Sequence, residues 1–277
     1  MGDAWPFESR ADLSPADYLA WVGARVFAVF DASTQDSGNV SFGVEAAGRR
    51  WFLKSAGHPA DPAPHLDHPA RVALLANAAR LAGSLEHPAL PRLRGEPASA
   101  WGPLLAYDWA PGELLHAPAA RRADPASAHQ RFRSLPADEI AIALDTVIDV
   151  HVRLCALGWV ACDFYDGAMI YDFVGRRLTL VDLDTYRQGP FVNEMGRMFG
   201  STRFMAPEEF RKDAVIDERT TVFTLGRTIS NFLGDGTLDA AAFRGADAQL
   251  AAMLGACRPA PDERFQSVAE LAAAWRR

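Results

Sequence analysis

Short apolar stretches, separated by polar or glycine-containing turns, fill the first hundred residues of the chain. The first three are rich in valine, phenylalanine or tryptophan, as strands are. The stretches cover residues 26–31, 40–45, 50–54, 90–94 and 103–109. Between the third and the fourth, residues 71–85 carry leucine, valine and alanine at the spacing of a helix. Ser14 followed by Pro15 predicts a further short helix over residues 14–24.

The pattern changes near residue 112. Residues 137–157 have the apolar spacing of a long amphipathic helix, which is expected to end at Gly158. Residues 116–136 are rich in alanine, proline and arginine and are expected to form a surface excursion. The pattern predicts one α+β domain with a small β-rich lobe and a larger helical lobe. The expected parts are an N-terminal helical extension over 1–25, a small lobe over 26–112 and a large lobe over 113–277.

Composition narrows the classes of function. A net charge of -7 over 277 residues argues against a nucleic-acid-binding protein, which normally carries a basic face. No apolar run reaches the roughly 18–20 residues that a membrane span needs, and the first residues lack the pattern of a signal peptide. The three cysteines show no metal-ligand spacing. We therefore expect a cytoplasmic protein with reduced thiols, no nucleic-acid partner and no membrane partner.

One lysine stands in an unusual setting. Lysine and arginine together number 28, but only Lys54 and Lys212 are lysines. Lys54 ends the apolar run Trp51-Phe52-Leu53, which reads as a strand. A lysine kept there suggests that a compact point charge is needed, because arginine offers a planar fork instead. The alternative is a lysine on an edge strand whose ammonium group reaches out to solvent.

Four aspartates follow apolar segments of the second half. Asp163 and Asp166 lie in the loop between the long helix and the apolar run 169–171, and Asp182 and Asp184 follow the apolar run 178–181. Acidic groups placed directly after buried strands are costly unless they bind a cation or hydrogen-bond donors. The set predicts a magnesium site beside a general base. For any one of them, an aspartate that only caps a turn is the alternative.

These features occur in the order of a known family. The motifs are Lys54, 85–90 with its histidine-proline pair, 104–113, Asp163, Asp182, 200–208, 221–226 and 262–265. Their order resembles that of the eukaryotic-type serine/threonine protein kinases, over residues 26–275. Residues 35–43 together with 163–167 are similar to a bacterial branch of kinase-like proteins. The resemblance implies a two-lobed kinase-like fold that binds ATP in a cleft between the lobes.

The resemblance also assigns residues to the nucleotide. Lys54 matches the lysine that grips the α- and β-phosphates, and the loop 35–41 would cover them. In the stretch 104–113, which looks like the hinge, the carbonyl of Asp108 and the amide of Ala110 would face the adenine and Glu113 would reach the ribose. The residues implied to bind ATP are Lys54, Ser37, Gly38, Asn39, Ser41, Asp108, Ala110 and Glu113.

For the chemistry, Asp163 matches the catalytic-loop aspartate that accepts the proton of the acceptor hydroxyl, and Asp182 matches the metal-binding aspartate. The metal implied is Mg²⁺, with Mn²⁺ as an alternative. Residues 200–208 resemble a substrate-docking segment, so a protein serine or threonine is the expected acceptor. The arginine of the last motif, Arg264, is implied to pair with Glu208.

The chain departs from the family pattern at several positions. No acid lies near Asn77, where a glutamate would pair with Lys54, and the glycine-rich loop keeps only two glycines. The other departures are Ala161, Cys162, Tyr165, Ala168 and Thr221, in place of the usual histidine, arginine, lysine, asparagine and aspartate. Without the arginine, switching by a phosphorylated activation segment is not expected. We hypothesise that Asp184 or Asp166 replaces the missing metal contact.

Three functions remain open at this stage. The first is an active ATP-dependent phosphotransferase, most simply a serine/threonine protein kinase. The second is a pseudokinase that binds or scaffolds without catalysis, which the changes at Ala161, Cys162 and Ala168 favour. The third is a kinase for a small molecule or antibiotic, which the loss of the catalytic-loop lysine favours and the docking-like segment 200–208 disfavours.

Overall fold

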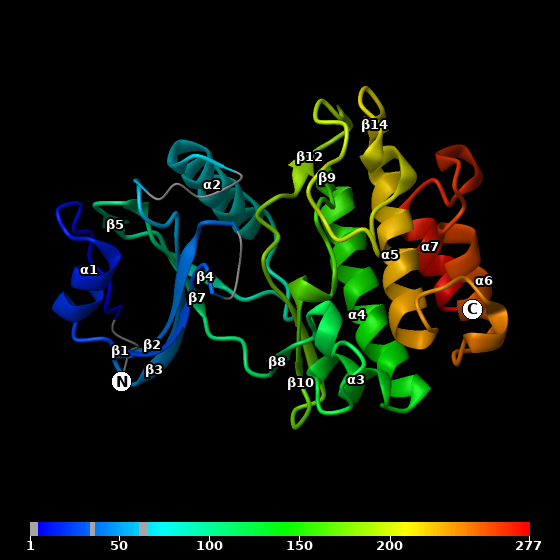
Figure 1. The fold of residues 1–277 in the computed structure, drawn as a ribbon, viewed down its shortest axis with the longest axis horizontal. Coiled ribbons are helices and arrows are strands. Elements are labelled where there is room, and N and C mark those ends of the chain that lie inside the picture. The colour runs from blue at the N-terminus through cyan, green and yellow to red at the C-terminus, as the bar shows by residue number, and fades with distance from the viewer. Residues whose placement is uncertain (1–4, 34–36, 61–65) are drawn as a thin grey trace. The chain divides into compact units, whose positions relative to one another are not determined.

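The computed structural model describes residues 5–33, 37–60 and 66–277 and has a mixed α+β fold (Figure 1). The chain divides into two compact units. The first holds Met1–Glu86 and Pro91–Ala110, and the second holds His87–Leu90 and Pro111–Arg277. The piece His87–Leu90 belongs to the second unit because Leu180 N donates to Ala89 O at 2.7 Å and His87 Nε2 lies 3.1 Å from Asp149 Oδ2.

The first unit is built on a five-stranded antiparallel sheet with strand order β1-β2-β3-β7-β4. The strands are β1 (Arg25–Phe30), β2 (Val40–Ala46), β3 (Arg49–Ser55), β4 (Leu93–Gly95) and β7 (Leu105–Asp108). Ala47 and Gly48 connect β2 to β3 with φ values of 49° and 74°, as a two-residue hairpin of twisted strands requires. A small hairpin of β5 (Ala98–Ser99) and β6 (Gly102–Pro103) precedes β7. Each of the five expected stretches therefore overlaps one of the five strands, with ends that differ by at most three residues.

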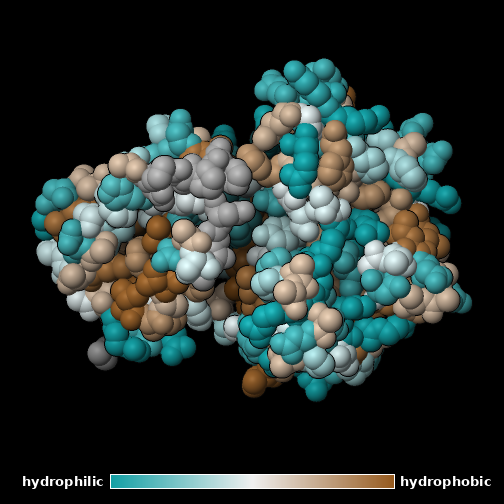
Figure 2. Space-filling model, in the orientation of Figure 1, coloured by the Kyte–Doolittle hydropathy of each residue, from teal (hydrophilic) through white to brown (hydrophobic). Residues whose placement is uncertain are grey.

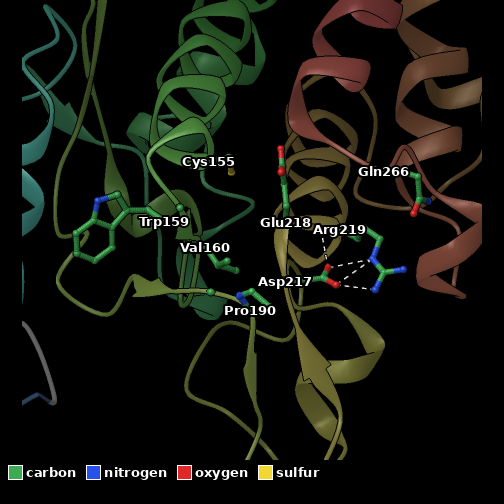
Figure 3. Close-up of a pocket in the computed structure, with 10 residues that line it drawn as sticks. Cys155, Trp159, Val160, Pro190, Asp217, Glu218, Arg219 and Gln266 are labelled. Atoms are coloured by element: carbon green, nitrogen blue, oxygen red, sulfur yellow. Dashed lines mark hydrogen bonds and ion pairs between the residues drawn. The ribbon is translucent and has the colours of Figure 1, made fainter.

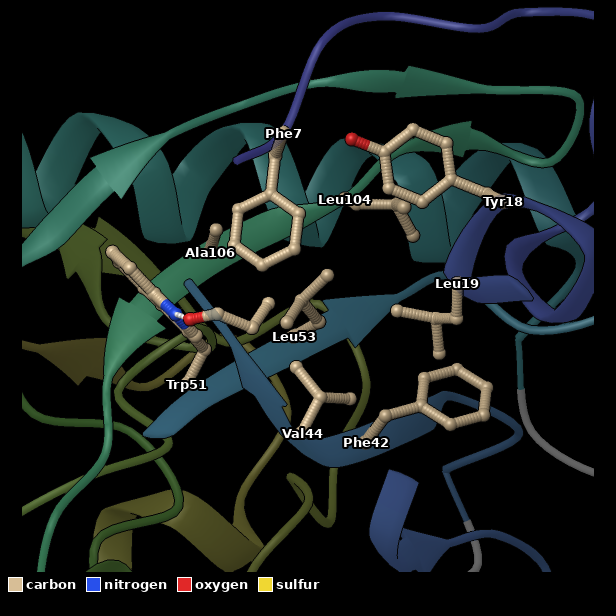
Figure 4. Packing of buried hydrophobic residues seen from close by; sticks show 10 residues of the cluster. Phe7, Tyr18, Leu19, Phe42, Val44, Trp51, Leu53, Leu104 and Ala106 are labelled. Atoms are coloured by element: carbon tan, nitrogen blue, oxygen red, sulfur yellow. Dashed lines mark hydrogen bonds between the residues drawn. The ribbon is translucent and has the colours of Figure 1, made fainter. Parts of the chain in front are cut away.

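One face of this sheet is covered by the N-terminal segment. The helix α1 (Pro15–Trp21) begins at Ser14, whose Oγ accepts a hydrogen bond from Asp17 N at 3.2 Å. Phe7, Tyr18 and Leu19 are at most 2% exposed and pack against apolar residues of the sheet (Figure 4). Those residues are Phe42, Val44, Ala46, Trp51, Leu53 and Ala106 of the sheet, together with Leu104 directly before β7. The N-terminal residues are thus part of the core of the first unit and not an added extension.

The other face carries the helix α2 (His68–Ser84). It begins at Asp67, whose carboxylate accepts a hydrogen bond from Ala70 N, and Leu75 and Ala78 pack against Ala56 and Leu105. Asp67 starts the helix three residues earlier than the apolar spacing indicates. Arg71 is 1% exposed and donates to the backbone carbonyls of Ala56, His58 and Leu66 at 2.7–3.2 Å. Its charge is therefore spread over three carbonyl dipoles that hold the chain before α2.

Helices dominate the second unit (Figure 1). They are α3 (Ala128–Arg133), α4 (Ala137–Ala156), α5 (Glu218–Leu233), α6 (Asp247–Ala256) and α7 (Val268–Trp275). The helix α5 contacts α3, α4, α6 and α7, and 13 of its 16 residues are buried. A helix buried on all sides forms the centre of its unit. The expected helix over 137–157 is confirmed, and Gly158 with φ of 83° follows its end.

Short strands flank these helices. The strands β10 (Met169–Asp172), β11 (Arg177–Leu180) and β8 (Glu113–Leu114) form one small sheet. Two further pairs join β9 (Trp159–Val160) to β12 (Arg187–Gln188) and β13 (Phe191–Val192) to β14 (Val215–Ile216). Two 3-10 turns matter below, η2 (Asp166–Ala168) and η3 (Pro207–Phe210). These pairs fix the loops that carry the four aspartates.

The expectation that residues 116–136 form a surface excursion is wrong for their second half. The helix α3 begins at Ser127, whose Oγ accepts from Gln130 N, and it buries His129 and Phe132. The ring of Phe132 lies 5.0 Å from that of Phe232 on α5. Arg133 on this helix is also held, because it donates to Gly234 O at 2.6 Å. A six-residue helix is too short to show apolar periodicity in the sequence.

The surface is mixed in polarity. In Figure 2, hydrophilic residues cover most of the visible face over α3 and α4. Apolar residues appear over β1–β3, where Val26 and Val29 are 41% and 46% exposed. None of the helices in the described ranges has both the length and the apolar character needed to cross a membrane.

Candidate functional site

Asp163 and Asp182 share an uncommon backbone conformation. Their φ values are 55° and 57°, in the left-handed region that costs a non-glycine residue roughly 1 kcal/mol. Among the described residues, Ala47, Arg176 and Asp213 are the other non-glycine cases. Ala47 and Arg176 lie in tight hairpins that need this conformation, whereas Asp163 and Asp182 lie outside hairpins. Such strain concentrates at functional sites, so it favours a functional role for both aspartates.

The loops that carry these two aspartates are tied to each other within the second unit. Thr185 Oγ1 donates to Cys162 O at 2.7 Å, and Val181 N donates to Ala168 O at 2.9 Å. The pairing of β9 with β12 places Arg187 opposite Val160. The segment with Asp182 and Asp184 therefore runs alongside the loop with Asp163. Asp182 is exposed and Asp184 is 7% exposed.

A buried histidine and a buried tyrosine contact each other next to the loops that carry Asp163 and Asp182. His151 on α4 is fully buried, its Nε2 lies 2.7 Å from Tyr186 Oη, and its ring lies 4.7 Å from that of Phe164. Burial lowers the pKa of His151 to about 4, so the imidazole is neutral at pH 7. Its Nδ1–H then donates a hydrogen bond to Val147 O at 2.7 Å, and its Nε2 accepts a hydrogen bond from the hydroxyl of Tyr186. Nothing in the sequence pattern indicated this pair, whose members are 35 residues apart.

The central helix also supports the loop. Thr221 on α5 is completely buried, and its Oγ1 accepts a hydrogen bond from Ala161 N at 3.0 Å. The sequence places Thr221 where the resemblance expects an aspartate. A hydroxyl oxygen accepts an amide proton as a carboxylate does, but it adds no charge. Thr221 therefore holds the backbone two residues before Asp163 without a buried anion.

Asp166 has a different role from the metal ligand that we hypothesised. It is 0% exposed, Arg203 Nη2 donates to its Oδ2 at 2.6 Å, and His116 Nδ1 lies 3.0 Å from its Oδ1. His129 Nδ1 lies 3.4 Å from Oδ2. Burial raises the pKa of a carboxyl, but these contacts outweigh burial and hold the pKa of Asp166 well below its usual range. Both oxygens are engaged inside the protein, which leaves no face for a metal ion.

The segment 200–208 passes close to Asp163. Gly200 has φ of 140°, and a Cβ built on it would lie 3.1 Å from Met205 Cγ and 3.6 Å from Asp163 Oδ1. At its other end, Arg264 makes a forked ion pair with Glu208 at 2.7 and 2.8 Å, and both side chains are at most 2% exposed. The pairing of Arg264 with Glu208, expected from the two motifs, is confirmed.

Glu209, next to that pair, has a strongly shifted titration. Its Oε2 accepts from Ala206 N at 2.6 Å. Burial, with the negative charges of Glu208 and Asp163 nearby, raises the pKa of Glu209 from 4.5 to about 8. The folded protein therefore keeps a proton at pH 7 that the unfolded chain releases.

We predict that Glu209 makes stability fall as the pH rises from about 4.5 to 8. The stabilisation is complete below the unfolded pKa and is lost through the folded pKa, with a slope of up to about 1.4 kcal/mol per pH unit. Glu209→Gln keeps the acceptor for Ala206 N and should remove this slope in urea unfolding between pH 5 and 8. Exposed Glu270, which accepts Gln266 N, is the matched control through Glu270→Gln. Equal slopes for wild type and Glu209→Gln would contradict the assignment.

In the first unit, Lys54 lies on a central strand. Because β3 is between β2 and β7, the edge-strand alternative for this lysine is wrong. Lys54 is 7% exposed and lies opposite Ser41, which is 2% exposed, in the β2–β3 register. Residues opposite each other point to the same face of a sheet. The structure therefore brings the expected phosphate-binding lysine and serine together.

The loop before β2 is described from Ser37 onward. Ser37 Oγ accepts a hydrogen bond from Asn39 N at 3.3 Å, and Asn39 is 5% exposed. Gly38 has φ of 78°, and its carbonyl lies only 2.0 Å from where a Cβ on Gly57 would be. The expected nucleotide-covering residues Gln35 and Asp36 lie outside the described residues.

The three expected hinge residues, Asp108, Ala110 and Glu113, lie where the chain passes from the first unit to the second. The carboxylate of Asp108, at the end of β7, accepts from Arg49 at 3.1 Å and from Arg94 at 2.7–3.0 Å. Ala110 is the last residue of the first unit. Glu113 belongs to the second unit, where both its oxygens accept from Arg131 Nη1 at 2.8 and 2.9 Å. The carboxylate of Glu113 is thus engaged by an arginine, which was not expected for a ribose-binding residue.

A separate cavity of about 310 Å³ lies in the second unit (Figure 3). Trp159, Val160 and Pro190 form its apolar wall, and Arg219 forks onto Asp217 at its other side. Asp217 also begins α5 by accepting from Arg219 N. Cys155 lines it as well, but burial raises the pKa of this thiol to about 12, so it is a poor nucleophile. None of the four candidate aspartates lines this cavity.

The acidic residues fit a metal site only in part. Within residues 5–33, 37–60 and 66–277, no group of three or more His, Cys, Asp or Glu side chains is arranged to hold an ion. Mg²⁺ in phosphoryl-transfer sites is usually held by only one or two carboxylates together with substrate phosphates and water. Asp182 and Asp184, two residues apart on one loop, fit that donor chemistry. Comparison with known proteins adds no assignment, because no family model and no curated protein matches the chain.

Proposed function

We propose that this protein is an ATP- and Mg²⁺-dependent phosphotransferase of the two-lobed kinase type, acting on serine or threonine of proteins. The observation that carries the proposal is the arrangement around Asp163. This aspartate is held in a left-handed conformation, on a loop tied to the Asp182 loop and close to Gly200. The docking-like segment that begins at Gly200 ends at the buried pair of Glu208 with Arg264.

The proposed reaction uses a general base, phosphate-binding groups and metal ligands. Asp163 accepts the proton of the attacking hydroxyl, since a positioned carboxylate contributes as a general base in phosphoryl transfer. Lys54 offers its ammonium group to phosphate oxygens, and backbone amides with the side chains of Ser37, Asn39 and Ser41 offer further donors. Asp182 and Asp184 would hold Mg²⁺, which supplies positive charge against the phosphates when bound.

One observation favours a second candidate function, a nucleotide-binding protein without turnover. Ala168 stands where the resemblance expects a metal-binding asparagine. It is 1% exposed, and its carbonyl accepts from Val181 N. Asp166 is fully engaged by Arg203 and His116 and does not compensate. A site with fewer metal ligands than usual can still bind nucleotide while catalysing slowly.

We predict that ATP with Mg²⁺ raises the thermal unfolding temperature of the wild-type protein and that ATP alone does not. Nucleotide at 100 times its dissociation constant should stabilise the folded state by about 2.7 kcal/mol. Lys54→Ala and Asp182→Asn should not respond, because each removes a charge proposed to contact phosphate or metal. Asp213→Asn is the matched control for Asp182→Asn, since Asp213 is also exposed with φ of 65°.

The outcomes separate the candidates. A wild-type protein that no nucleotide stabilises, with or without Mg²⁺, would overturn the proposed function and the nucleotide-binding alternative together. A metal-dependent shift without phosphate transfer to casein or to the protein itself would favour the nucleotide-binding protein without turnover. A shift that Asp182→Asn and Asp213→Asn both retain would remove Asp182 from the metal site.

A further inference from the structure

The buried carboxylate of Asp166 joins two segments that are far apart in sequence. Asp166 begins the turn η2, three residues after Asp163, and Arg203 lies in the segment 200–208. Their ion pair spans 37 positions at 2.6 Å, and the carboxylate is 0% exposed while the arginine is 20% exposed. An ion pair removed from water in this way is much less screened than the surface pairs of this protein.

Both the side chain and the backbone of Arg203 are held by neighbouring residues. Besides Asp166, its Nη1 donates to Asn231 Oδ1 at 3.4 Å, and its guanidinium lies 4.8 Å from the ring of Phe204. Its own carbonyl accepts from Arg227 Nε at 2.8 Å. Asn231 and Arg227 both come from α5, the buried central helix. The arginine thus connects the segment to the loop on one side and to the core of the unit on the other.

The position of Arg203 determines where the start of the segment lies. Ser201 O accepts from Phe204 N at 2.9 Å and from Met205 N at 3.3 Å, so residues 201–205 form one tight turn. Gly200 directly precedes this turn and is the residue whose Cβ position lies 3.6 Å from Asp163 Oδ1. Fixing Arg203 against Asp166 therefore fixes the backbone beside the proposed catalytic carboxylate.

We propose that Asp166 and Arg203 are positioning residues, and that their ion pair holds the segment 200–205 beside Asp163 without any covalent modification. In proteins switched by phosphorylation, a new phosphate orders such a segment by pairing with arginines. Here the arginine lies in the segment itself and already has an internal carboxylate partner. Cys162, which precedes Asp163, offers no cation for an added phosphate. The role in acceptor placement rests on the proposed function, whereas the ordering of the segment does not.

His116 and His129 complete the surroundings of the carboxylate. His116 is 35% exposed and His129 is 3% exposed, and each has Nδ1 within 3.4 Å of an Asp166 oxygen. With Arg203 they give the carboxylate three partners from three separate segments. Arg203→Gln therefore leaves a buried carboxylate with only the two imidazoles, and Asp166→Asn leaves Arg203 without a counterion.

The first test uses backbone amide hydrogen exchange in the full-length protein. We expect peptides covering 199–206 to be protected in wild-type protein whose intact mass shows no phosphate. In Arg203→Gln and in Asp166→Asn, exchange of these peptides should rise at least tenfold while α4 stays protected. Arg203→Lys keeps the charge and should restore part of the protection. Arg153→Gln, which removes an exposed ion pair with Asp149 on α4, is the matched control and should change nothing at 199–206.

The second measurement separates positioning from general support, with dephosphorylated casein as the acceptor. Asp166→Asn should raise the KM for casein about tenfold while the thermal response to ATP with Mg²⁺ stays at the wild-type value. Unchanged exchange at 199–206 in both single variants, or protection in the wild type that appears only after phosphorylation of Ser201 or Thr202, overturns the proposal. If a single variant unfolds entirely, the proposal is decided by the hydrogen exchange at 199–206 in Arg203→Lys and in the unmodified wild-type protein. Absence of any nucleotide response in the wild type refutes the proposed function alone.

Discussion

Asp163→Asn is expected to lower phosphate transfer by about 10²- to 10⁴-fold, the contribution of a positioned general base. Asparagine has nearly the same shape and tolerates the left-handed conformation that Asp163 adopts at φ of 55°, so the fold should be unchanged. It has no carboxylate to accept the proton of the acceptor hydroxyl. Radiolabelled phosphate incorporation into casein, with ATP and Mg²⁺ saturating, measures the loss.

The same preparation should keep its thermal response to ATP with Mg²⁺, because Asp163 is assigned to the acceptor and not to the nucleotide. Asp213→Asn, a change of the same chemistry at another left-handed aspartate, should retain full activity. Activity of Asp163→Asn equal to the wild type would show that another group removes the proton, and it would withdraw the central assignment. Loss of nucleotide binding in Asp163→Asn would instead move this residue to the nucleotide site.

Arg264→Leu is expected to destabilise the protein by about 3–5 kcal/mol, the range measured when one partner of a buried ion pair is removed. The carboxylate of Glu208 would stay buried with Thr220 Oγ1 as its remaining described donor, at 2.8 Å. Three backbone carbonyls that Arg264 satisfies, on Arg219, Arg258 and Pro259, would also lose their donor. Urea unfolding, monitored by tryptophan fluorescence, gives the change in free energy.

Two comparisons make this result specific. Arg276→Leu removes an arginine that pairs with Asp145 while both side chains are more than 40% exposed, and it should cost no more than about 1 kcal/mol. The double variant Glu208→Gln with Arg264→Leu should be less destabilised than the sum of the single variants, because no uncompensated charge remains. A cost for Arg264→Leu within the range of Arg276→Leu would contradict a structural role for the buried pair.

The sequence predicts those parts of the fold and site that depend on local signals. The resemblance to the kinase family implied the pair of Glu208 with Arg264, because each residue lies in one of the matching motifs. Residues 137–157 were predictable because a long amphipathic helix has a strong periodicity. Lys54 was expected within an apolar strand, and the structure places it on the central strand β3.

Other features depend on contacts between distant residues and have no local signal. Asp166 was chosen as a metal ligand because nothing in the segment 200–208 indicates that Arg203, 37 residues away, pairs with it. The sequence likewise does not show that the neutral His151 on α4 accepts a hydrogen bond from Tyr186, because the two residues come together only in the folded protein. The raised pKa of Glu209 arises chiefly from burial, which the local sequence Pro207-Glu208-Glu209 does not reveal.

The core position of the N-terminal segment has a consequence for how the first unit can fold during protein synthesis. Residues near 10 hydrogen-bond to residues near 100, since Arg10 N donates to Ala98 O and Ala100 N donates to Leu13 O. Phe7 leaves the ribosome before Leu104 and Ala106, with which it packs and which are made about one hundred residues later. Native contacts of such large separation form late. The aromatic side chains of this segment therefore stay exposed until translation has passed Ala110. During that interval a chaperone can recognise them.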